Sequence, residues 1–169
     1  MTLLSWTVST PTLPLSVIAD DDIIVAAGFA DPLVLAGRLI DDNRRVEPVD
    51  DLGAISQSVM AYLDGDLDAL DGAALDQPGQ VFHQQVWEVM RQIPAGQTWT
   101  YTELATKAGR PAAVRSAASA CARNLIAPFV PCHRVVRSDG TMGGYYYGTD
   151  VKRWLLMHES GKDAVADKR

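Results

Sequence analysis

Short apolar runs and polar turns alternate in the first part of the chain. Residues 15–19 and 23–29 are apolar runs separated by the turn-forming cluster Asp20-Asp21-Asp22. Two such runs joined by a short polar turn predict a β-hairpin. Apolar residues then recur at helical spacing before a turn at 64–66, namely Ile55, Val59, Met60 and Leu63. This part is predicted to combine a small antiparallel sheet with a helix.

The second part of the chain has a helical period. A first helix is predicted from the stripe Phe82, Val86, Val89, Met90 and Ile93. Thr102 is the expected N-cap of a short helix that reaches Lys107 and stops at Gly109. Pro111 suits the first turn of a further helix over 112–123. Helix, glycine-containing turn and helix form the outline of a helix-turn-helix, which presents a helix to a DNA groove.

Two loops are predicted before a last helix. Residues 128–136 are expected to form an extended loop, and residues 143–148, rich in Gly and Tyr, a second loop. The expected cap of the last helix is Thr149 or Asp150. Its apolar stripe consists of Val151, Trp154, Leu155 and His158.

A linker and a change of charge divide the chain at nearly the same place. Residues 70–80 are rich in Asp, Gly, Gln and Pro, which is typical of a linker. Residues 1–80 hold 3 Lys/Arg and 14 Asp/Glu, whereas residues 81–169 hold 12 and 7. The overall charge of −6 is therefore divided into −11 and +5, and only the second half suits a polyanion. The predicted domains are 1–76 and 77–169.

Composition narrows the class of protein. Hydrophobic residues make up 47% of the 169 residues, which suffices for one domain or two small ones with packed cores. No apolar run has membrane-spanning length and no basic or signal-type leader is visible, so we expect a cytoplasmic protein. Two cysteines, Cys121 and Cys132, are too few for a disulfide framework, which leaves thiols available for chemistry in a reducing compartment.

Cys132 is the candidate nucleophile. It follows Pro131, which limits the backbone, and precedes His133 and Arg134. Nearby basic groups favour the reactive thiolate, although a buried structural cysteine is the alternative interpretation. In an extended loop His133 would point away from Cys132, so a bend or a bridging water would be needed for the histidine to act as a base. A structural role is the alternative for His133 as well.

Glu159 stands near the end of the last predicted helix, where a negative charge opposes the helix dipole. It lies four residues after Leu155, so it can face the apolar stripe. We expect a partner to hold it there, and orienting a histidine is a suitable task. The alternative is an ordinary exposed Glu near a frayed helix end.

The predicted helix over 112–123 consists mainly of small residues and carries Arg115 and Arg123. A slim helix can approach a ligand closely, and its arginines can contact phosphates or enter a base stack. Tight packing on neighbouring helices is the alternative reason for the small residues. The sequence has neither the paired ligand spacing of a zinc site nor a phosphate-binding glycine loop.

Ordered motifs over residues 80–160 carry a family resemblance. They are Phe82-x-x-x-Val86-Trp87, Ile93-Pro94-x-Gly96, Thr98-x-Thr100-Tyr101-x-Glu103-Leu104-Ala105, Arg115, Asn124, Pro131-Cys132-His133-Arg134-Val135, Gly144-Tyr145 and Lys152-x-Trp154-Leu155-Leu156-x-x-Glu159. In this order they resemble the O6-alkylguanine-DNA alkyltransferases, also called methylated-DNA–protein-cysteine methyltransferases. The N-terminal part fits more loosely, through Ser9-Thr10-Pro11, Pro14-Leu15 and Ala26-Ala27-Gly28-Phe29.

The resemblance implies a fold and an activity. The fold is a ribonuclease-H-like α/β domain, a small antiparallel sheet plus helix, followed by a mostly α domain with a winged-helix-like helix-turn-helix. The activity is direct-reversal DNA repair, in which an alkyl group of O6-alkylguanine passes irreversibly to Cys132, once per molecule; O4-alkylthymine is left open as a second substrate. The implied partner is double-stranded DNA with alkylated guanine, bound by a monomer without cofactor or metal. Cooperative binding to DNA is left open.

The resemblance also implies a role for each matching residue. Cys132 is the alkyl acceptor, His133 activates it through water, and Glu159 orients the histidine. Tyr101 helps to turn out the nucleotide and donates a proton to the leaving guanine. Arg115 replaces the flipped base in the stack, and Asn124 is the hinge between the DNA-reading helix and the cysteine loop. The implied guanine pocket includes Val135, Tyr145 and Tyr146. The implied DNA-binding face, docked in the minor groove, includes Thr100, Ala113, Ser116, Ser119 and Arg123.

Three departures from the family pattern concern the pocket and the DNA-reading helix. Leu125 stands where the family usually has Pro, Ala118 where it usually has Gly, and Tyr146 and Tyr147 occupy a stretch that is usually small and rich in Gly. They leave the range of alkyl adducts and the DNA affinity open, but they do not affect the nucleophile.

Three other functions remain as alternatives. A non-catalytic alkyl-lesion-binding protein of the related alkyltransferase-like group would typically have Trp in place of Cys132. A cysteine hydrolase using Cys132 and His133 would have no evident use for Arg115 and the DNA-binding helix. A DNA-binding regulator with a damage-sensing thiol would be expected to have a separate regulatory domain, which the sequence does not reveal.

Overall fold

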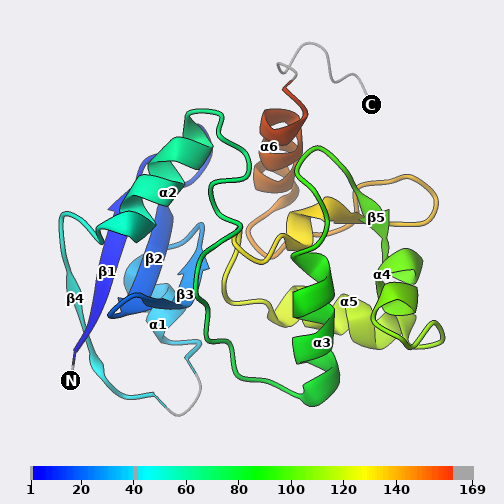
Figure 1. Ribbon diagram of the computed structural model, residues 1–169, viewed down its shortest axis with the longest axis horizontal. Coiled ribbons are helices and arrows are strands. Elements are labelled where there is room, and N and C mark those ends of the chain that lie inside the picture. The colour runs from blue at the N-terminus through cyan, green and yellow to red at the C-terminus, as the bar shows by residue number, and fades with distance from the viewer. Residues whose placement is uncertain (1, 40–41, 162–169) are drawn as a thin grey trace. The chain divides into compact units, whose positions relative to one another are not determined.

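The computed structural model describes residues 2–39 and 42–161. The chain forms two compact units, the first made of Met1–Pro78 with Leu125–Phe129 and the second of Gly79–Asn124 with Val130–Arg169 (Figure 1). The short segment 125–129 is therefore part of the first unit, although it lies far along the sequence.

A four-stranded sheet forms the centre of the first unit. Its strands β1 (Thr2–Val8), β2 (Leu15–Asp20), β3 (Ile23–Gly28) and β4 (Arg45–Pro48) lie in the order β3-β2-β1-β4. The predicted hairpin is confirmed, since β2 and β3 pair antiparallel and Asp21 adopts the positive φ of 52° that a two-residue turn needs. The sheet is not purely antiparallel as expected, because β4 pairs parallel with β1. The mostly polar and exposed edge strand β4 has no apolar alternation that could have predicted it.

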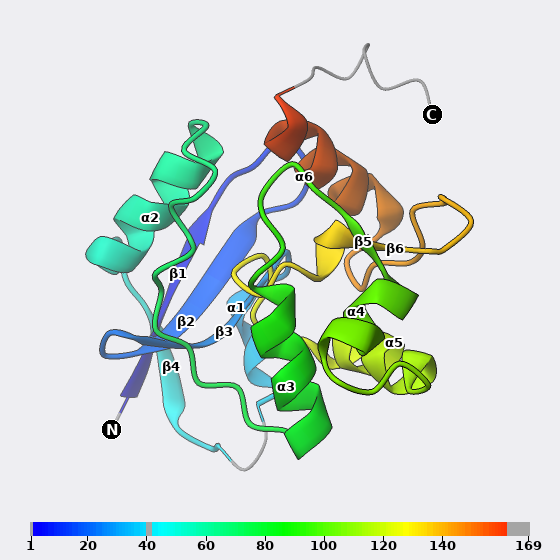
Figure 2. The ribbon, with the colours of Figure 1, turned by 45° about the vertical axis from the view of Figure 1, so that its right-hand side comes forward.

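Two helices cover this sheet. The short α1 (Pro32–Ala36) packs against β2 and β3, and α2 (Ala54–Leu63) lies on the other face (Figure 2). The helix at 54–63 was predicted, but the stripe that it buries differs from the predicted one. Ile55, Val59 and Tyr62 are buried, whereas Met60 is exposed.

Two segments outside the sheet protect the edge of β3. The Ile24 amide donates to the Ala74 carbonyl at 2.9 Å, and the Ala27 amide donates to the Leu125 carbonyl at 2.8 Å. Part of the predicted linker over 70–80 is therefore held against the sheet, with Leu70 buried. Covering an edge strand in this way satisfies backbone groups that would otherwise be open to other chains.

The second unit is mostly helical, as predicted. Its helices are α3 (Val81–Met90), α4 (Tyr101–Lys107), α5 (Val114–Arg123) and α6 (Thr149–Ser160), with a 3₁₀ helix η1 at Cys132–Arg134. The helices α3, α4 and α5 pack on one another, and the Trp87 indole donates to the Ala120 carbonyl at 2.9 Å. The strands β5 (Trp99–Thr100) and β6 (Val135–Val136) pair parallel. This pair joins the start of α4 to the end of η1.

Helix starts differ from the predicted ones. Thr100, not Thr102, caps α4, because its hydroxyl accepts from the Glu103 amide while the Glu103 carboxylate accepts from the Thr100 amide. Helix α5 begins at Val114, so Pro111 lies in the preceding turn rather than in the helix. Neither Thr149 nor Asp150 caps α6; both lie in its first turn, after Gly148 with a φ of 102°.

The predicted order of helix, glycine-containing turn and helix is confirmed. Helix α4 ends at Lys107, the turn contains Gly109 at a φ of 89°, and α5 follows. The cysteine segment is not extended as predicted, because Cys132–Arg134 is a 3₁₀ helix. None of the helices in the described ranges is long and apolar enough to cross a bilayer.

Candidate active site

Cys132 lies at the start of η1 and is held there by backbone bonds. Its amide donates to the Val130 carbonyl at 2.9 Å, and the Arg134 amide donates to the Pro131 carbonyl at 2.9 Å. The side chain is buried, with 8% of its surface exposed. The tight turn brings a thiol to the edge of a cavity without leaving it open to solvent on all sides.

Asn124 joins the end of α5 to the cysteine segment. It is the C-cap residue of α5, and its side-chain amide donates to the Val130 carbonyl at 2.8 Å and to Cys132 Sγ at 3.3 Å. The second bond stabilises negative charge on the sulfur, since a donor favours the thiolate over the thiol. The position predicted as a hinge therefore also contacts the reactive atom.

A buried ion-pair cluster holds His133. Its Nε2 lies 2.8 Å from Glu159 Oε2, and the Arg134 guanidinium donates to both Glu159 oxygens at 2.8 Å each. A further Arg134 nitrogen donates to the Ile93 carbonyl at 2.6 Å. Glu159 therefore faces inward from α6, as predicted. The sequence named Arg134 only as part of a motif, and no periodicity could have shown that it pairs with Glu159.

The charges within this cluster are set by burial and by Arg134. Complete burial lowers the pKa of His133, although the Glu159 charge opposes the shift. Burial alone would raise the pKa of Glu159, but the charge that His133 carries when protonated, hydrogen bonds from Arg134 and His133, and the Arg134 charge hold this pKa well below its usual range. Because Arg134 stays cationic, Glu159 is a carboxylate and His133 is a neutral imidazole at neutral pH.

The hydrogen bond to Glu159 fixes the tautomer of His133. A carboxylate only accepts, so the neutral imidazole must carry its proton on Nε2. Its Nδ1 is then a lone-pair acceptor, and this buried atom has no hydrogen-bond partner among the residues that the structure describes. The site thus contains a proton acceptor on the residue next to the thiol.

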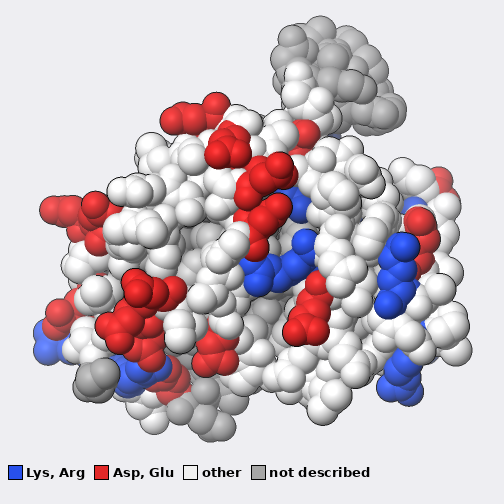
Figure 3. Space-filling view, viewed as in Figure 1, with Lys and Arg blue, Asp and Glu red and all other residues white. Residues whose placement is uncertain are grey.

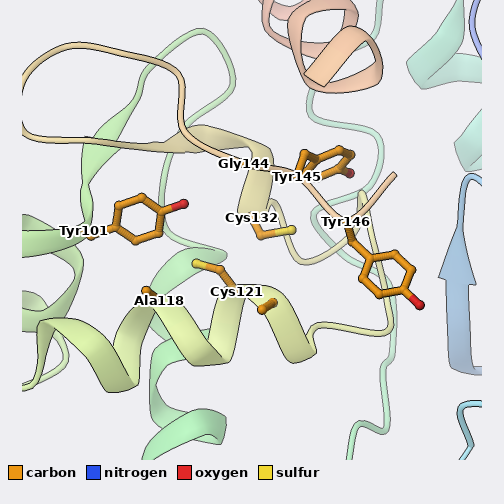
Figure 4. Close-up of a pocket in the computed structure, with 8 residues that line it drawn as sticks. Tyr101, Ala118, Cys121, Cys132, Gly144, Tyr145 and Tyr146 are labelled. Carbon is orange, nitrogen blue, oxygen red and sulfur yellow. The ribbon is translucent and has the colours of Figure 1, made fainter. Parts of the chain in front are cut away.

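Cys132 opens into a pocket of about 240 Å³. Figure 4 shows its side chain beside Tyr145, with Tyr101 on the opposite side and α5 below. The lining residues come from α4, α5, η1 and the loop before α6: Tyr101, Ala118, Cys121, Ala122, Cys132, Gly144, Tyr145 and Tyr146. The predicted pocket residues Tyr145 and Tyr146 are among them, whereas Val135 is buried without lining the pocket. Cys121 was not predicted as a pocket residue.

Tyr101 presents a protonated hydroxyl. Burial raises its pKa to about 12, and the charges of Cys121 and Cys132 contribute further. The hydroxyl is therefore a donor at neutral pH. Tyr101 is the first residue of α4, so the β5–β6 pair and the Thr100 cap together determine where this donor lies.

Lys152 supports the pocket from α6. It is fully buried and donates to the Val135 carbonyl at 2.7 Å and to the Gly144 carbonyl at 3.2 Å. Burial lowers its pKa. The lysine connects the cysteine segment to the tyrosine-rich loop, a contact that its place in a sequence motif did not reveal.

Comparisons with known proteins agree with this geometry. Residues 81–161 match the family model described as "6-O-methylguanine DNA methyltransferase, DNA binding domain". The chain is 36% identical to a methylated-DNA–protein-cysteine methyltransferase of Shigella flexneri, over 93% of this chain and 95% of that protein. This chain belongs to the methylated-DNA–protein-cysteine methyltransferase family. The resemblance inferred from the sequence is confirmed.

Two further relatives match this chain over different shares of their own length. The chain is 52% identical over 86 residues to the bifunctional transcriptional activator/DNA repair enzyme Ada of Escherichia coli, a match that covers 51% of this chain and only 24% of Ada. A crystal structure of Mycobacterium tuberculosis OGT in complex with DNA aligns with a TM-score of 0.79 at 29% identity, over 95% of this chain and 96% of that one.

The candidate DNA-binding residues of the alkyltransferase lie on and near α5. Arg115, Ser116 and Arg123 are exposed, and Ala113, Ser119 and Thr100 are partly exposed. The Arg123 guanidinium donates to the Ser119 hydroxyl at 3.3 Å. On the face seen in Figure 3, most acidic side chains lie over the first unit, whereas the second unit shows a few scattered basic ones. Thr100 has a structural task as well, because it caps α4.

The residues that depart from the family pattern make specific contacts in the structure. The amide of Leu125, which Pro would lack, donates to Gln77 Oε1 at 2.5 Å. Tyr147 packs edge-on against Tyr145 and Tyr146, with ring centroids 5.7 and 5.0 Å away. The loop at the pocket is thus stiffened by aromatic packing instead of being small and rich in Gly. Ala118 lines the pocket.

Proposed function

We propose that the protein repairs DNA by moving the alkyl group of O6-alkylguanine onto Cys132 Sγ. The observation that carries this proposal is a buried pair beside a pocket thiol. His133 follows the pocket-lining Cys132 directly in sequence, and its Nε2 lies 2.8 Å from Glu159 Oε2. A base held in one orientation beside a thiol is an arrangement for forming a thiolate nucleophile. Family membership gives the thiol its substrate class.

The histidine and its carboxylate prepare the nucleophile. His133 Nδ1 takes the Cys132 proton through an intervening water molecule, while Glu159 accepts from Nε2–H and stabilises the imidazolium that forms. Asn124 donates to the resulting thiolate. The roles follow from the tautomer, since only Nδ1 has a lone pair available.

The transfer itself is a displacement at the alkyl carbon. The bond from Sγ to carbon forms as the bond from carbon to guanine O6 breaks, and the Tyr101 hydroxyl supplies the proton that guanine takes up as it leaves. The raised pKa of Tyr101 keeps that proton on the hydroxyl until it is needed. The product is a thioether, which water does not cleave readily, so each molecule acts once.

The target base must leave the duplex to reach this pocket, because the thiol is buried where a base that is still stacked and paired cannot approach it. Arg115, which is exposed near the start of α5, enters the space that the base vacates in this proposal. Ala113, Ser116 and Ser119 allow α5 to approach the minor groove closely, and Arg123 is suited to a phosphate. We propose a monomer acting on duplex DNA, with a winged-helix-like second domain and a ribonuclease-H-like first domain.

Nucleoside analysis tests the repair reaction. A duplex with one O6-methylguanine is incubated with an equimolar amount of protein, digested to nucleosides and separated by chromatography. We expect unmodified deoxyguanosine to replace the methylated nucleoside, and Cys132→Ser to bind the duplex without changing it. Binding without conversion by the unaltered protein would instead indicate a lesion-binding protein, and turnover of small esters or peptides would indicate a hydrolase.

A further inference from the structure

The pocket contains a second thiol. Cys121 on α5 lines the same pocket as Cys132, and neither cysteine forms a disulfide. In Figure 4 the two side chains reach the pocket from different elements, Cys132 from η1 and Cys121 from the helix below it. The neighbours of Cys121 along the pocket wall, Ala118 and Ala122, are small. The reaction described above uses no atom of Cys121.

The electrostatic surroundings of Cys121 depend on the state of Cys132. Burial raises the pKa of the Cys121 thiol, the Cys132 thiolate raises it further, and the Lys152 ammonium opposes the shift. Before the reaction, Cys121 is therefore protonated and does not compete with Cys132 for an alkyl group. Alkylation turns Cys132 into an uncharged thioether, which removes the repulsion from the thiolate.

We propose that Cys121 captures the far end of a bifunctional lesion after Cys132 has taken the near end, an inference that rests on the proposed alkyl transfer. The lesion class is O6-(2-haloethyl)guanine, whose two-carbon chain ends in a halide. Cys132 Sγ first bonds to the carbon on O6 and guanine leaves. Cys121 Sγ then bonds to the second carbon, the halide leaves, and the Cys121 proton passes to water. The product is a bridge of two carbons between the two sulfurs, with one halide ion and one proton released.

The chemistry of the intermediate favours this second step. A 2-haloethyl thioether is itself an alkylating agent, because its sulfur can displace the halide to form a three-membered sulfonium ring. That ring reacts with the nearest nucleophile, which can be water, a DNA base or the Cys121 thiol that shares the pocket. Its positive charge also favours the thiolate form of Cys121. Closing the bridge within the protein prevents a covalent link to DNA.

Intact mass spectrometry with peptide mapping tests the bridge. The full chain is incubated with a duplex carrying one freshly prepared O6-(2-chloroethyl)guanine, and separately with 1,2-dibromoethane without DNA. A bridge adds about 26 Da and joins the peptides of Cys121 and Cys132, whereas hydrolysis leaves a hydroxyethyl group of about 44 Da on Cys132 alone. We expect the bridged product from the unaltered protein with both probes.

Two variants, Cys121→Ser and Cys121→Ala, provide the matched comparison. Both should lose the bridged product and give hydroxyethyl-Cys132 or a DNA-linked protein instead, with product shares normalised to each variant's own transfer from O6-methylguanine. Equal shares of hydroxyethylated or DNA-linked protein with and without Cys121 would overturn the inference. Failure of the proposed repair function looks different, since Cys132 would then gain no methyl group from the O6-methylguanine duplex.

Discussion

At the scale of single residues, the site depends on one buried carboxylate with two partners. Glu159 accepts two hydrogen bonds from Arg134 and one from His133, and all three side chains are almost completely buried. A charge buried in this way is tolerated only because it is paired, and the pairing also fixes the imidazole ring. Stability and the proposed activation of Cys132 therefore depend on the same atom pairs.

Replacing this carboxylate should affect both properties. Glu159→Gln leaves the Arg134 charge buried without its counter-ion, so we expect the free energy of unfolding to fall by about 3–5 kcal/mol. Methyl transfer should also slow, because a neutral amide stabilises the imidazolium form of His133 less well than the carboxylate does. Urea unfolding and single-turnover kinetics measure the two effects.

The matched control for Glu159→Gln is an exposed acid on the same helix. Asp150 pairs with Arg153 in solvent at 3.2 Å, and such pairs contribute little, so Asp150→Asn should change the free energy of unfolding by less than about 1 kcal/mol. Equal losses for the two variants would contradict the account of Glu159.

At the scale of elements, the site is assembled by short connections between neighbouring segments. The β5–β6 pair places the start of α4 beside the end of η1, and the Asn124 amide joins the end of α5 to the same segment. Tyr101 and Cys132 therefore face one pocket although they are far apart in sequence. The helix cap at Thr100 belongs to this assembly, because it fixes where α4 begins.

The cap can be tested against the position that the sequence favoured. Thr100→Ala removes the acceptor for the Glu103 amide and should lower the free energy of unfolding by about 1 kcal/mol. Thr102 lies two residues later and is exposed, so Thr102→Ala should lower the free energy of unfolding clearly less. Urea unfolding measures the free energy of unfolding of both variants. A larger loss of this free energy for Thr102→Ala would show that the helix starts where the sequence suggested.

The exposed arginine of α5 gives a prediction on base extrusion. If Arg115 offsets about 1–3 kcal/mol of the unstacking cost, Arg115→Ala should slow methyl transfer from duplex DNA by about 5–150-fold. Transfer from single-stranded DNA should change much less, since no stack has to be filled. Arg153→Ala on α6 is the control for loss of a positive charge. Equal slowing on both substrates would assign Arg115 to phosphate binding alone.

The sequence predicted the hairpin and the main helices, and its errors have physical causes. Apolar periodicity shows which face of α3 is buried, but not where a helix begins, because both Thr100 and Thr102 are good caps and only Thr100 has Glu three residues later. Strand β4 was not predicted, because a polar edge strand lacks the apolar alternation that indicates a strand.

Only those residues of the candidate site that belong to sequence motifs could be predicted. Cys132, His133 and Glu159 are brought together as expected, whereas the contacts of Arg134 and Lys152 with distant carbonyls depend on the folded chain. Cys121 had no motif to indicate it, and the pocket shows that it lies in the same wall as Cys132, the proposed nucleophile. Long-range contacts between unlike elements leave no periodic trace in a sequence.

At the scale of the whole molecule, charge and burial determine how the protein responds to pH. The acidic side chains are concentrated in residues 1–80 and the basic ones in residues 81–169, so the DNA-binding unit is positive in a chain of net charge −6. Two histidines of the second unit, His83 and His133, are buried, and burial lowers the pKa of each.

Stability should therefore fall as the pH falls from about 6.5 to 5. Below the unfolded-state pKa of about 6.5, the unfolded chain binds protons that the native histidines do not, which lowers the free energy of unfolding by at most about 1.4 kcal/mol per pH unit and histidine. Glu159 does not contribute in this range. Its pKa is lowered, so its contribution is present above the unfolded-state value of about 4.3 and is lost only in stronger acid.

Urea unfolding at several pH values measures this slope. His83→Gln should remove the contribution of His83 to this slope and leave the contribution of His133. A free energy of unfolding that stays constant between pH 6.5 and 5 would contradict the neutral, buried state of His133.

The most direct test of the central claim is the intact mass of the protein during titration with a duplex that carries one O6-methylguanine. We predict a single increment of about 14 Da, located on Cys132 by peptide mapping, complete at one duplex per protein and never repeated on the same molecule. No mass gain at an equimolar amount of duplex, or a methyl group on any residue other than Cys132, would contradict this claim.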